Sequence, residues 1–409
     1  MAPLPLLSSI RVVESSMLGP GALTTHLADL GADVIKVEPP QGDYLREMTW
    51  PMVEGVSLMH LHISRGKRSV VLDLRDEAGV DVYLDLVRHA DVVVEAMRPG
   101  GLERRGLGYE RLREVNPQIV FCTISGYGMT GPYKDLPSHG IAYDVWAGLV
   151  PPDVDEGGDC TIPEHPSVGI HAGPLFGALG VLAGVVHARA TGEGCRLEIA
   201  QSDAAAAMDW LRSETHRAYE RPESEVTGNK ADGYRRRAPG TAGMRDGVRY
   251  QFYASSDGHV LFMASERAFW EAFCEAVGRR DVFESHPGSR YADHAVGDTA
   301  LRAELREVFA GRTTAEWVAL ADEANLPIAP VNTPKTLADD PQFADRLPWL
   351  TADEYGADLV PSPIKVVDGE LPAPRPAPTV GQHTDEVLRD VAGYDDDRLA
   401  ELRAAGVLG

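Results

Sequence analysis

The sequence predicts an α/β protein with two domains, and three observations carry this prediction. Its 409 residues are more than one hydrophobic core ordinarily holds. Residues 10–38 read as strand, helix and strand, and strands that are joined through a helix pair in parallel. Residues 211–244 are polar, charged and poor in apolar periodicity, as expected of a long connection between domains.

The first domain is expected over residues 1–210. Its first two strands are the apolar run IRVVES and the alternating run ADVIKVE, and a Gly-Pro-Gly turn opens the helix between them. This turn does not have the GxGxxG spacing of dinucleotide-binding sites. A proline at a helix start leaves backbone N–H groups without partners, so residues 19–22 are a candidate cradle for a phosphate or thioester oxygen.

Basic residues gather in three loops of this domain. The loops hold Arg46, then Arg65, Lys67 and Arg68, and then Arg98, Arg104 and Arg105. Ligands of open α/β sheets bind beyond the carboxyl ends of the strands, so these loops favour a phosphorylated ligand. Ordinary ion pairing with the acidic residues of the chain is the alternative interpretation.

Residues 125–174 are the candidate reaction centre. Two histidines, His139 and His171, lie there among small and apolar residues on either side of an acidic loop. Histidine changes its charge near neutral pH, so such a pair suits acid–base chemistry. A capping or core role for each histidine is the alternative. The acidic residues of the loop are Asp153, Asp155, Glu156 and Asp159.

Residues 245–330 predict a small α+β domain. Within it, residues 248–266 read as a hairpin with Asp-Gly at its turn, and three amphipathic helices follow. Residues 331–409 read as an extended connection that ends in two short helices.

Composition argues against several classes of partner. The net charge is −23, and such a surface repels nucleic acids and anionic membranes. No apolar run reaches the ~18 residues that span a bilayer, and the start of the chain lacks the pattern of a signal peptide. The four cysteines are widely spaced and read as the reduced thiols of a cytoplasmic protein. Neither a metal-ligand cluster nor a nicotinamide or flavin fingerprint is found, so no metal and no such cofactor is expected.

Several motifs, in a fixed order, point to a family. The sequence contains LADLGADVIKVEPPQGD, RGKRSVVLDL, RPGGLERRGLGYERLREVNPQIV, SGYGMTGPY, APVNTPKTLADDPQF and GQHTDEVL. In these motifs it resembles the family III CoA-transferases, which include the α-methylacyl-CoA racemases, over essentially its whole length. The resemblance implies a Rossmann-like large domain to which residues 331–409 return, a small domain joined by two long linkers, and an interlocked homodimer. It also implies an acyl-CoA and a carboxylic acid as substrates.

The resemblance further implies a set of coenzyme A contacts. Residues 16–18 are expected to face the pantetheine, and the arginines are expected to pair with the phosphates. At Ala96 the family more often has asparagine, so one polar contact is missing. By motif position the contacts are Ser16, Met17, Leu18, Arg46, Arg65, Arg68, Met97 and Arg104.

The residues that would carry the chemistry depart from the family pattern. Transferases of the family use an aspartate nucleophile, which forms an anhydride and then a CoA thioester with the enzyme. Ile170 stands at that position here. Racemases need two bases on opposite faces of the α-carbon. The resemblance places one of these bases at His139, followed by Gly140 where the racemases have an aspartate.

Three functions therefore stay open. The first is transfer of CoA from an acyl-CoA to a carboxylic acid by a displaced carboxylate nucleophile, for which Asp144, Asp159 and Glu164 are the candidates. The second is a racemase-type transfer of the α-proton by His139, with His171 replacing the missing base and Asp144 or Asp159 as alternatives to His171. The third is a CoA-binding protein or partner subunit without transfer activity of its own.

Overall fold

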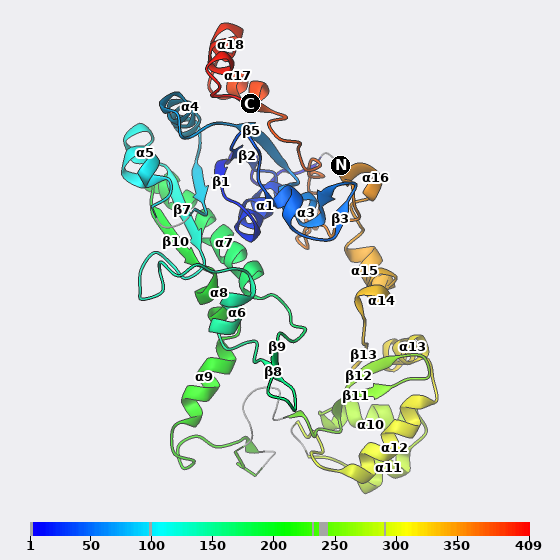
Figure 1. Cartoon of the computed structure of the whole chain (residues 1–409). Coiled ribbons are helices and arrows are strands. Elements are labelled where there is room, and N and C mark those ends of the chain that lie inside the picture. Colours follow the sequence, from blue (N-terminus) through cyan, green and yellow to red (C-terminus); the bar gives the residue numbers. More distant parts are fainter. Residues whose placement is uncertain (1–2, 98–99, 231–232, 237–243, 290–291) are drawn as a thin grey trace. The chain divides into compact units, whose positions relative to one another are not determined.

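The computed structural model describes residues 3–97, 100–230, 233–236, 244–289 and 292–409 (Figure 1). Arg98, which the sequence places in a basic loop, lies outside the described residues. The chain forms two compact units. One comprises Met1–Met208 with Ala344–Gly409, and the other comprises Asp209–Phe343.

The first unit is built on a six-stranded sheet in which all neighbouring strands are parallel. Val13 pairs with Ile35 on one side and with Val93 on the other. The prediction of an α/β fold with a parallel sheet is confirmed. In spatial order the strands are β10 (Arg196–Ala200), β7 (Val120–Ser125), β6 (Val92–Glu95), β1 (Arg11–Ser15), β2 (Asp33–Glu38) and β5 (Lys67–Val71).

Helices pack on both faces of this sheet, because successive residues of a strand point to opposite sides. Val12 and Leu23 belong to the buried cluster on one face, whereas Val13 and Val82 belong to the cluster on the other. The helices of the first face are α1 (Ala22–Asp29) and α7 (Gly169–Thr191), and those of the second are α4 (Glu77–Arg88), α5 (Tyr109–Val115), α17 (Thr384–Asp390) and α18 (Asp396–Ala404).

The C-terminal segment is joined to β5 by hydrogen bonds. The backbone N–H of His383 donates to the carbonyl oxygen of Ser69 at 3.0 Å. The backbone N–H of Val71 donates to the hydroxyl of Thr384 at 3.1 Å. The second face of the sheet is therefore completed by residues from the end of the chain, which include Val387, Leu388, Leu399 and Leu402.

Helix α7 packs closely against the sheet through its small residues. A methyl group on Gly177 would lie 2.3 Å from a side-chain carbon of Leu23, so glycine is required for this contact. Among the described residues, α7 is the one helix whose length and composition would allow it to cross a membrane. Half of its most apolar segment is buried, and core helices pass the same test.

Shorter elements connect the strands of the first unit and follow them. They are η1 (Gly19–Gly21), α2 (Leu45–Met48), β3 (Met52–Val53), β4 (Val56–Ser57), α3 (Leu58–Ser64), η2 (Glu103–Arg105), α6 (Ile141–Trp146), β8 (Asp153–Val154), β9 (Cys160–Thr161), α8 (Gln201–Met208) and α16 (Ala352–Tyr355).

The second unit holds a three-stranded antiparallel sheet, and the predicted hairpin forms its first two strands. Trp270 and Phe273 are fully buried in its core, whereas Phe252 is exposed. Helix α9 begins this unit, in the stretch where the sequence predicts a connection without structure. The strands are β11 (Tyr250–Ala254), β12 (His259–Met263) and β13 (Ile328–Pro330). The helices are α9 (Trp210–Tyr219), α10 (Arg267–Ala276), α11 (Arg280–Ser285), α12 (Thr299–Ala310), α13 (Thr314–Ala324) and α14 (Pro334–Ala338), and the boundary between the units falls within α15 (Pro341–Arg346).

Two histidines of α3 are held in their neutral form. Nη1 of Arg46 lies 2.9 Å from Nε2 of His60, which accepts the hydrogen bond as a neutral imidazole. Burial and this arginine lower the pKa of His60 to about 4. Burial and Arg65 likewise lower the pKa of His62 to about 4.

These two histidines predict that the fold loses stability in mild acid. Between pH 6.5 and about 4 the unfolded chain binds protons that the folded chain does not, so stability falls as the pH falls through this window. The loss amounts to at most about 3 kcal/mol for each histidine. Urea midpoints measured from about pH 7.5 down to about pH 4 check this. His60→Gln is expected to weaken the dependence of the urea midpoint on pH. Replacement of the exposed His216 by glutamine is expected to leave this dependence unchanged. An unchanged midpoint down to pH 4 would contradict the prediction.

Candidate active site

A pocket of about 580 Å³ opens beyond the carboxyl ends of β1, β6 and β7. From β1 the chain adds β2 and β5 on one side of the sheet and β6, β7 and β10 on the other. A crevice forms where the strand order reverses in this way, and ligands of open α/β sheets bind there. The pocket is lined by Met17, Leu18, Gly19, Pro20, Tyr44, Ala96, Met97, Gly101, Arg104, Arg105, Ile124, Ser125, Gly126, Tyr127, Lys134, Leu136, Pro137, Ser138, His139, Gly140, Tyr143, Ile170 and Gln201.

One wall of the pocket is the loop that follows β1. Leu18 in this loop has φ 60° and ψ −149°, a backbone conformation that residues other than glycine rarely adopt. Such a residue costs of order 1–3 kcal/mol and persists only where its surroundings hold it. Two N–H groups of the predicted cradle, those of Gly21 and Ala22, donate to carbonyl oxygens within the turn. Met17 and Leu18 line the pocket, while Ser16 is buried beneath them.

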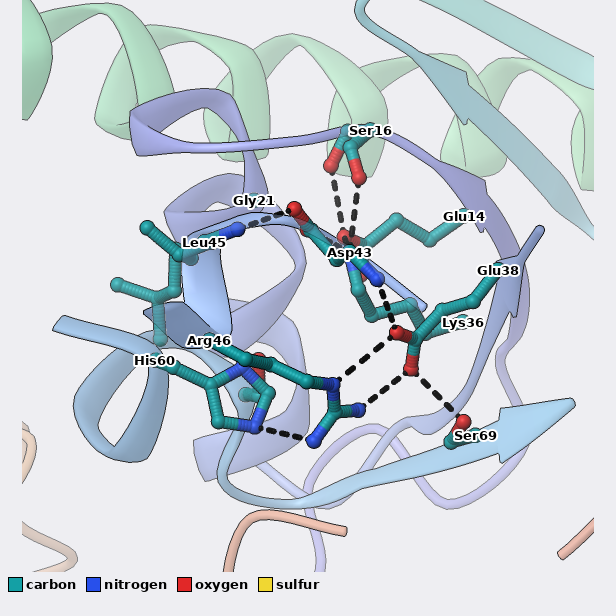
Figure 2. A network of polar contacts seen from close by, with 12 residues as sticks. Glu14, Ser16, Gly21, Lys36, Glu38, Asp43, Leu45, Arg46, His60 and Ser69 are labelled. Atoms are coloured by element: carbon teal, nitrogen blue, oxygen red, sulfur yellow. Dashed lines mark hydrogen bonds and ion pairs between the residues drawn. The ribbon is translucent and has the colours of Figure 1, made fainter. Parts of the chain in front are cut away.

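A network of buried charges lies directly under this loop (Figure 2). The carboxylate of Glu14 meets Nζ of Lys67 at 2.8 Å and Nζ of Lys36 at 3.3 Å. It also accepts hydrogen bonds from the hydroxyls of Ser16 and Thr24. Burial alone would raise the pKa of Glu14, but the two lysines outweigh burial and hold that pKa at about 2. Glu14 is therefore ionised near neutral pH.

The network continues from Lys36 to the loop after β2. Nζ of Lys36 lies 3.0 Å from Oδ2 of Asp43, whose backbone N–H donates to Glu38 at 2.8 Å. Glu38 pairs with Arg46 at 2.7 Å and accepts the hydroxyl of Ser69 at 2.7 Å. Figure 2 shows these side chains converging from separate strands and loops. Ion pairs thus join β1, β2 and β5, and Lys67 contributes from the first residue of β5.

Three of the arginines proposed as phosphate contacts are paired with carboxylates of the chain. Arg46 binds Glu38, His60 and the carbonyl oxygen of Pro378. Arg65 forms two hydrogen bonds to Asp29, and Arg68 forms two to Asp33. Of the residues named as coenzyme A contacts, those that line the pocket are Met17, Leu18, Met97 and Arg104.

The two candidate histidines lie in different places. His139 lines the pocket beside Gly140. His171 is exposed and does not belong to the described lining, and its electrostatic neighbours are His26 and His62. The structure therefore brings one of the two predicted imidazoles to the pocket.

Ile170 forms part of the wall opposite the loop after β1. A methyl group on Gly19 would lie 3.5 Å from Cβ of Ile170, and one on Gly140 would lie 3.8 Å from its Cγ2. The side chain of Gln201 lines the same region and is 2% exposed. The position at which the sequence resemblance leads us to expect a nucleophile thus faces the pocket here with an apolar side chain.

The candidate carboxylates lie outside the described lining of the pocket. Asp144 is fully buried, and its Oδ1 accepts the backbone N–H of Gly169 at 2.7 Å. It therefore holds the first turn of α7, where a negative charge is favoured. Asp159 is exposed at the β8–β9 turn, where its N–H donates to Asp155 at 2.9 Å. Glu164 is exposed.

The comparisons with known proteins agree over nearly the whole chain. The model of CoA-transferase family III matches residues 7–384. This chain belongs to CoA-transferase family III. It is 29% identical to succinyl-CoA:glutarate CoA-transferase of Homo sapiens, over 98% of this chain and 90% of the relative. It is 32% identical to succinyl-CoA:mesaconate CoA-transferase of Haloarcula marismortui, over 95% of this chain and 97% of the relative.

A solved structure gives the same result. The crystal structure of a CAIB/BAIF family protein from Brucella suis matches with a TM-score of 0.75 and 25% identity. The match covers 95% of this chain and 100% of that one. The family resemblance seen in the sequence motifs is confirmed.

In this family III member the pocket combines positive charge with hydroxyl groups. Arg104, Arg105 and Lys134 line it, and no aspartate or glutamate is among its described lining residues. Burial raises the pKa of Tyr143, whose hydroxyl faces Ser138 and Gln201. Such a site can hold an anionic ligand and donate hydrogen bonds to it.

Sequence reasoning missed several of these residues. Glu14 and Lys36 lie inside apolar strands, and a charged side chain in a buried strand needs a partner of opposite charge. That signal was present and could have identified the network. Lys134 and Gln201 carry no comparable signal, because only the fold brings their loops to the pocket.

Proposed function

We propose that this protein binds an acyl-CoA in the pocket beyond β1, β6 and β7 and moves CoA to a carboxylic acid. The observation that carries the proposal is the positively charged lining of that pocket in a chain of net charge −23. A volume of about 580 Å³ lies within the range of small-molecule sites. Met17, Leu18 and Met97 would contact the pantetheine, and Arg104 would pair with a phosphate. Arg46, Arg65 and Arg68 would take that role only by exchanging a carboxylate for a phosphate.

We further propose that the acceptor is a dicarboxylic acid. The two relatives described above are named for succinyl-CoA with glutarate or mesaconate as the acceptor. A dicarboxylic acid keeps one charge while the other carboxylate reacts. Arg105 lines the pocket and could pair with the carboxylate that does not react, and Lys134 could do so by exchanging Asp135, which it contacts at 2.7 Å.

The transfer can proceed without a carboxylate of the enzyme. The acceptor carboxylate attacks the thioester carbonyl, so that a C–O bond forms and the C–S bond breaks, giving a mixed anhydride and the CoA thiolate. The thiolate then attacks the other carbonyl of the anhydride and expels the first acid. His139 can donate an N–H to the oxyanion that develops in each step. A displaced nucleophile at Asp144 or Asp159 is the alternative route, and it would leave a covalent adduct.

The experiment combines a transfer assay with mass spectrometry of the intact protein. Succinyl-CoA is incubated with glutarate or mesaconate, and a new acyl-CoA is expected in the products. A protein mass unchanged by acyl-CoA supports the direct route, whereas a hydroxylamine-sensitive adduct identifies an enzyme nucleophile. The absence of a new acyl-CoA with every dicarboxylate tried would overturn the proposed function.

A second candidate function is α-proton transfer, which the position of His139 in the pocket favours. A positioned base contributes typically 10²- to 10⁴-fold. A 2-methylacyl-CoA incubated in deuterated water would then take up deuterium at the α-carbon. His139→Ala should abolish this uptake, and the absence of uptake in the wild-type protein would exclude the candidate.

We also propose the assembly and compartment that the family suggests. The strand order β5-β2-β1-β6-β7-β10 supports a Rossmann-like unit, with residues 245–330 as a separate small domain. Leu175, Leu179 and Val186 expose an apolar face of α7, which supports a homodimer in which a second copy covers it. The four cysteines are free, which suits a cytoplasmic protein. Light scattering of the purified protein tests the dimer.

A further inference from the structure

We propose that Glu14, Lys36 and Lys67 position the pocket loop formed by residues 16–21, and so set the affinity for acyl-CoA. The inference rests on the proposed function, because this loop lines the pocket assigned to acyl-CoA. None of the three side chains lines the pocket, so they act through the loop as positioning residues.

Each lysine holds one end of the loop. Nζ of Lys36 donates to the carbonyl oxygen of Ser16 at 2.8 Å, and Nζ of Lys67 donates to the carbonyl oxygen of Gly21 at 2.8 Å. Both ammonium groups also meet the carboxylate of Glu14. Figure 2 shows Ser16 next to this carboxylate, joined to it by a dashed line. One buried carboxylate thus fixes the distance between the two ends of the loop.

The arrangement is rigid because every charge in it is buried and paired. The side chains of Glu14, Lys36 and Lys67 are at most 4% exposed. Asp43 supplies the second negative charge at 3.0 Å from Lys36. Two positive and two negative charges therefore balance in a region that water does not reach, where an unpaired charge is costly. Any shift of the loop would stretch these pairs.

The loop needs such support because its conformation is strained and its position defines the width of the pocket. Leu18 holds φ 60° between the two anchored ends. Gly19 faces Ile170 across the pocket, with room for little more than a methyl group. Release of one anchor would therefore move the wall that faces the reacting end of the ligand.

Lys67 also gives the anchor a dependence on pH. The charged groups that face it are Glu14 from β1, Lys36 from β2 and Asp43 from the following loop, and the titratable His26 of α1, whose pKa burial lowers, is a further neighbour. Burial is the largest influence and lowers the pKa of Lys67 to about 8, against the attraction of Glu14. Above that pH the ammonium loses its proton and its attraction to Glu14, so the KM for acyl-CoA is expected to rise.

The test compares Lys67→Met, Lys67→Arg and the control Lys335→Met, whose lysine lies in α14 of the other unit. Lys67→Met is expected to raise the KM for succinyl-CoA about tenfold while kcat changes less, and to remove the rise in KM above pH 8. Lys67→Arg keeps a positive charge at all pH values, so it should restore the affinity and also lack the alkaline rise. The control should match the wild-type protein.

Hydrogen–deuterium exchange of residues 16–21 separates this inference from the proposed function. Faster exchange there in Lys67→Met, with slow exchange retained in β6, supports the anchor even in a protein that transfers no CoA. A folded Lys67→Met with unchanged exchange, KM and pH profile would overturn the inference. If Lys67→Met does not fold, the pH profile of Lys67→Arg decides: an alkaline rise equal to that of the wild-type protein contradicts the proposal.

Discussion

Replacement of Glu14 by glutamine is expected to lower the free energy of unfolding by about 3–5 kcal/mol, because it leaves buried charge without a partner. Glu14 is the carboxylate that both Lys36 and Lys67 contact, and its side chain has no exposed area. Glutamine keeps the shape of the side chain but removes the negative charge. The two ammonium groups would then repel each other in a region of low dielectric constant. Urea denaturation of both proteins at pH 7 measures the effect.

A matched control is available on the surface. Glu110 is 82% exposed and lies 3.8 Å from Arg113, so Glu110→Gln should change stability by no more than about 0.5 kcal/mol. If Glu14→Gln and Glu110→Gln lost the same free energy of unfolding, the prediction would be contradicted, because burial of Glu14 would then add nothing to the cost of removing its charge. Because the pKa of Glu14 is lowered from 4.5 to about 2, its contribution is present above pH 4.5 and is lost as the pH falls toward 2.

Ile170→Asp is expected to create a covalent intermediate that the wild-type protein does not form. The substitution places a carboxylate in the first turn of α7, where the helix dipole favours negative charge. The side chain would face the pocket beside Gly19 and Gly140. Intact mass after mixing with acyl-CoA should show about one hydroxylamine-sensitive adduct per chain, and the kinetics should become ping-pong.

The control for the covalent adduct expected in Ile170→Asp is Ile170→Asn. Its asparagine side chain has about the size of aspartate but lacks the nucleophilic carboxylate. It should form no adduct. An adduct already present in the wild-type protein would contradict the prediction, and peptide mapping would then test Asp144 and Asp159 first. An adduct missing from Ile170→Asp, in a variant that still binds CoA, would mean that the thioester does not reach this wall.

Much of the fold could be read from the sequence, because short-range patterns determine it. Residues 10–38 predict strand, helix and strand, and the structure has β1, α1 and β2 there. Of the basic residues, Arg46 and Arg104 follow the carboxyl ends of β2 and β6 as expected, whereas Lys67 and Arg68 are the first residues of β5 and lie at its amino end. Their partners could not be read, because the carboxylates that pair with Arg65 and Arg68 are Asp29 and Asp33 of earlier segments.

The candidate site was predicted only in part. Which of its residues reach the pocket depends on the rotation of each helix about its axis and on the conformation of the loops. Ile170 and His171 are adjacent on α7, and adjacent residues of a helix point about 100° apart. One of them therefore lines the pocket while the other turns toward His26 and His62. The segment is short and rich in glycine, so it has no apolar periodicity from which to predict which of the two side chains faces the pocket.

The attachment of the chain's end to β5 has a consequence for synthesis on the ribosome. Val70 and Ile35 share a core with Leu388 and Leu402, so that face of the sheet cannot close until the last helices have emerged. Until then the nascent chain presents apolar surface that should recruit chaperones. Truncation before α17 would make that exposure permanent, so a shortened protein should accumulate in inclusion bodies rather than as an active fragment.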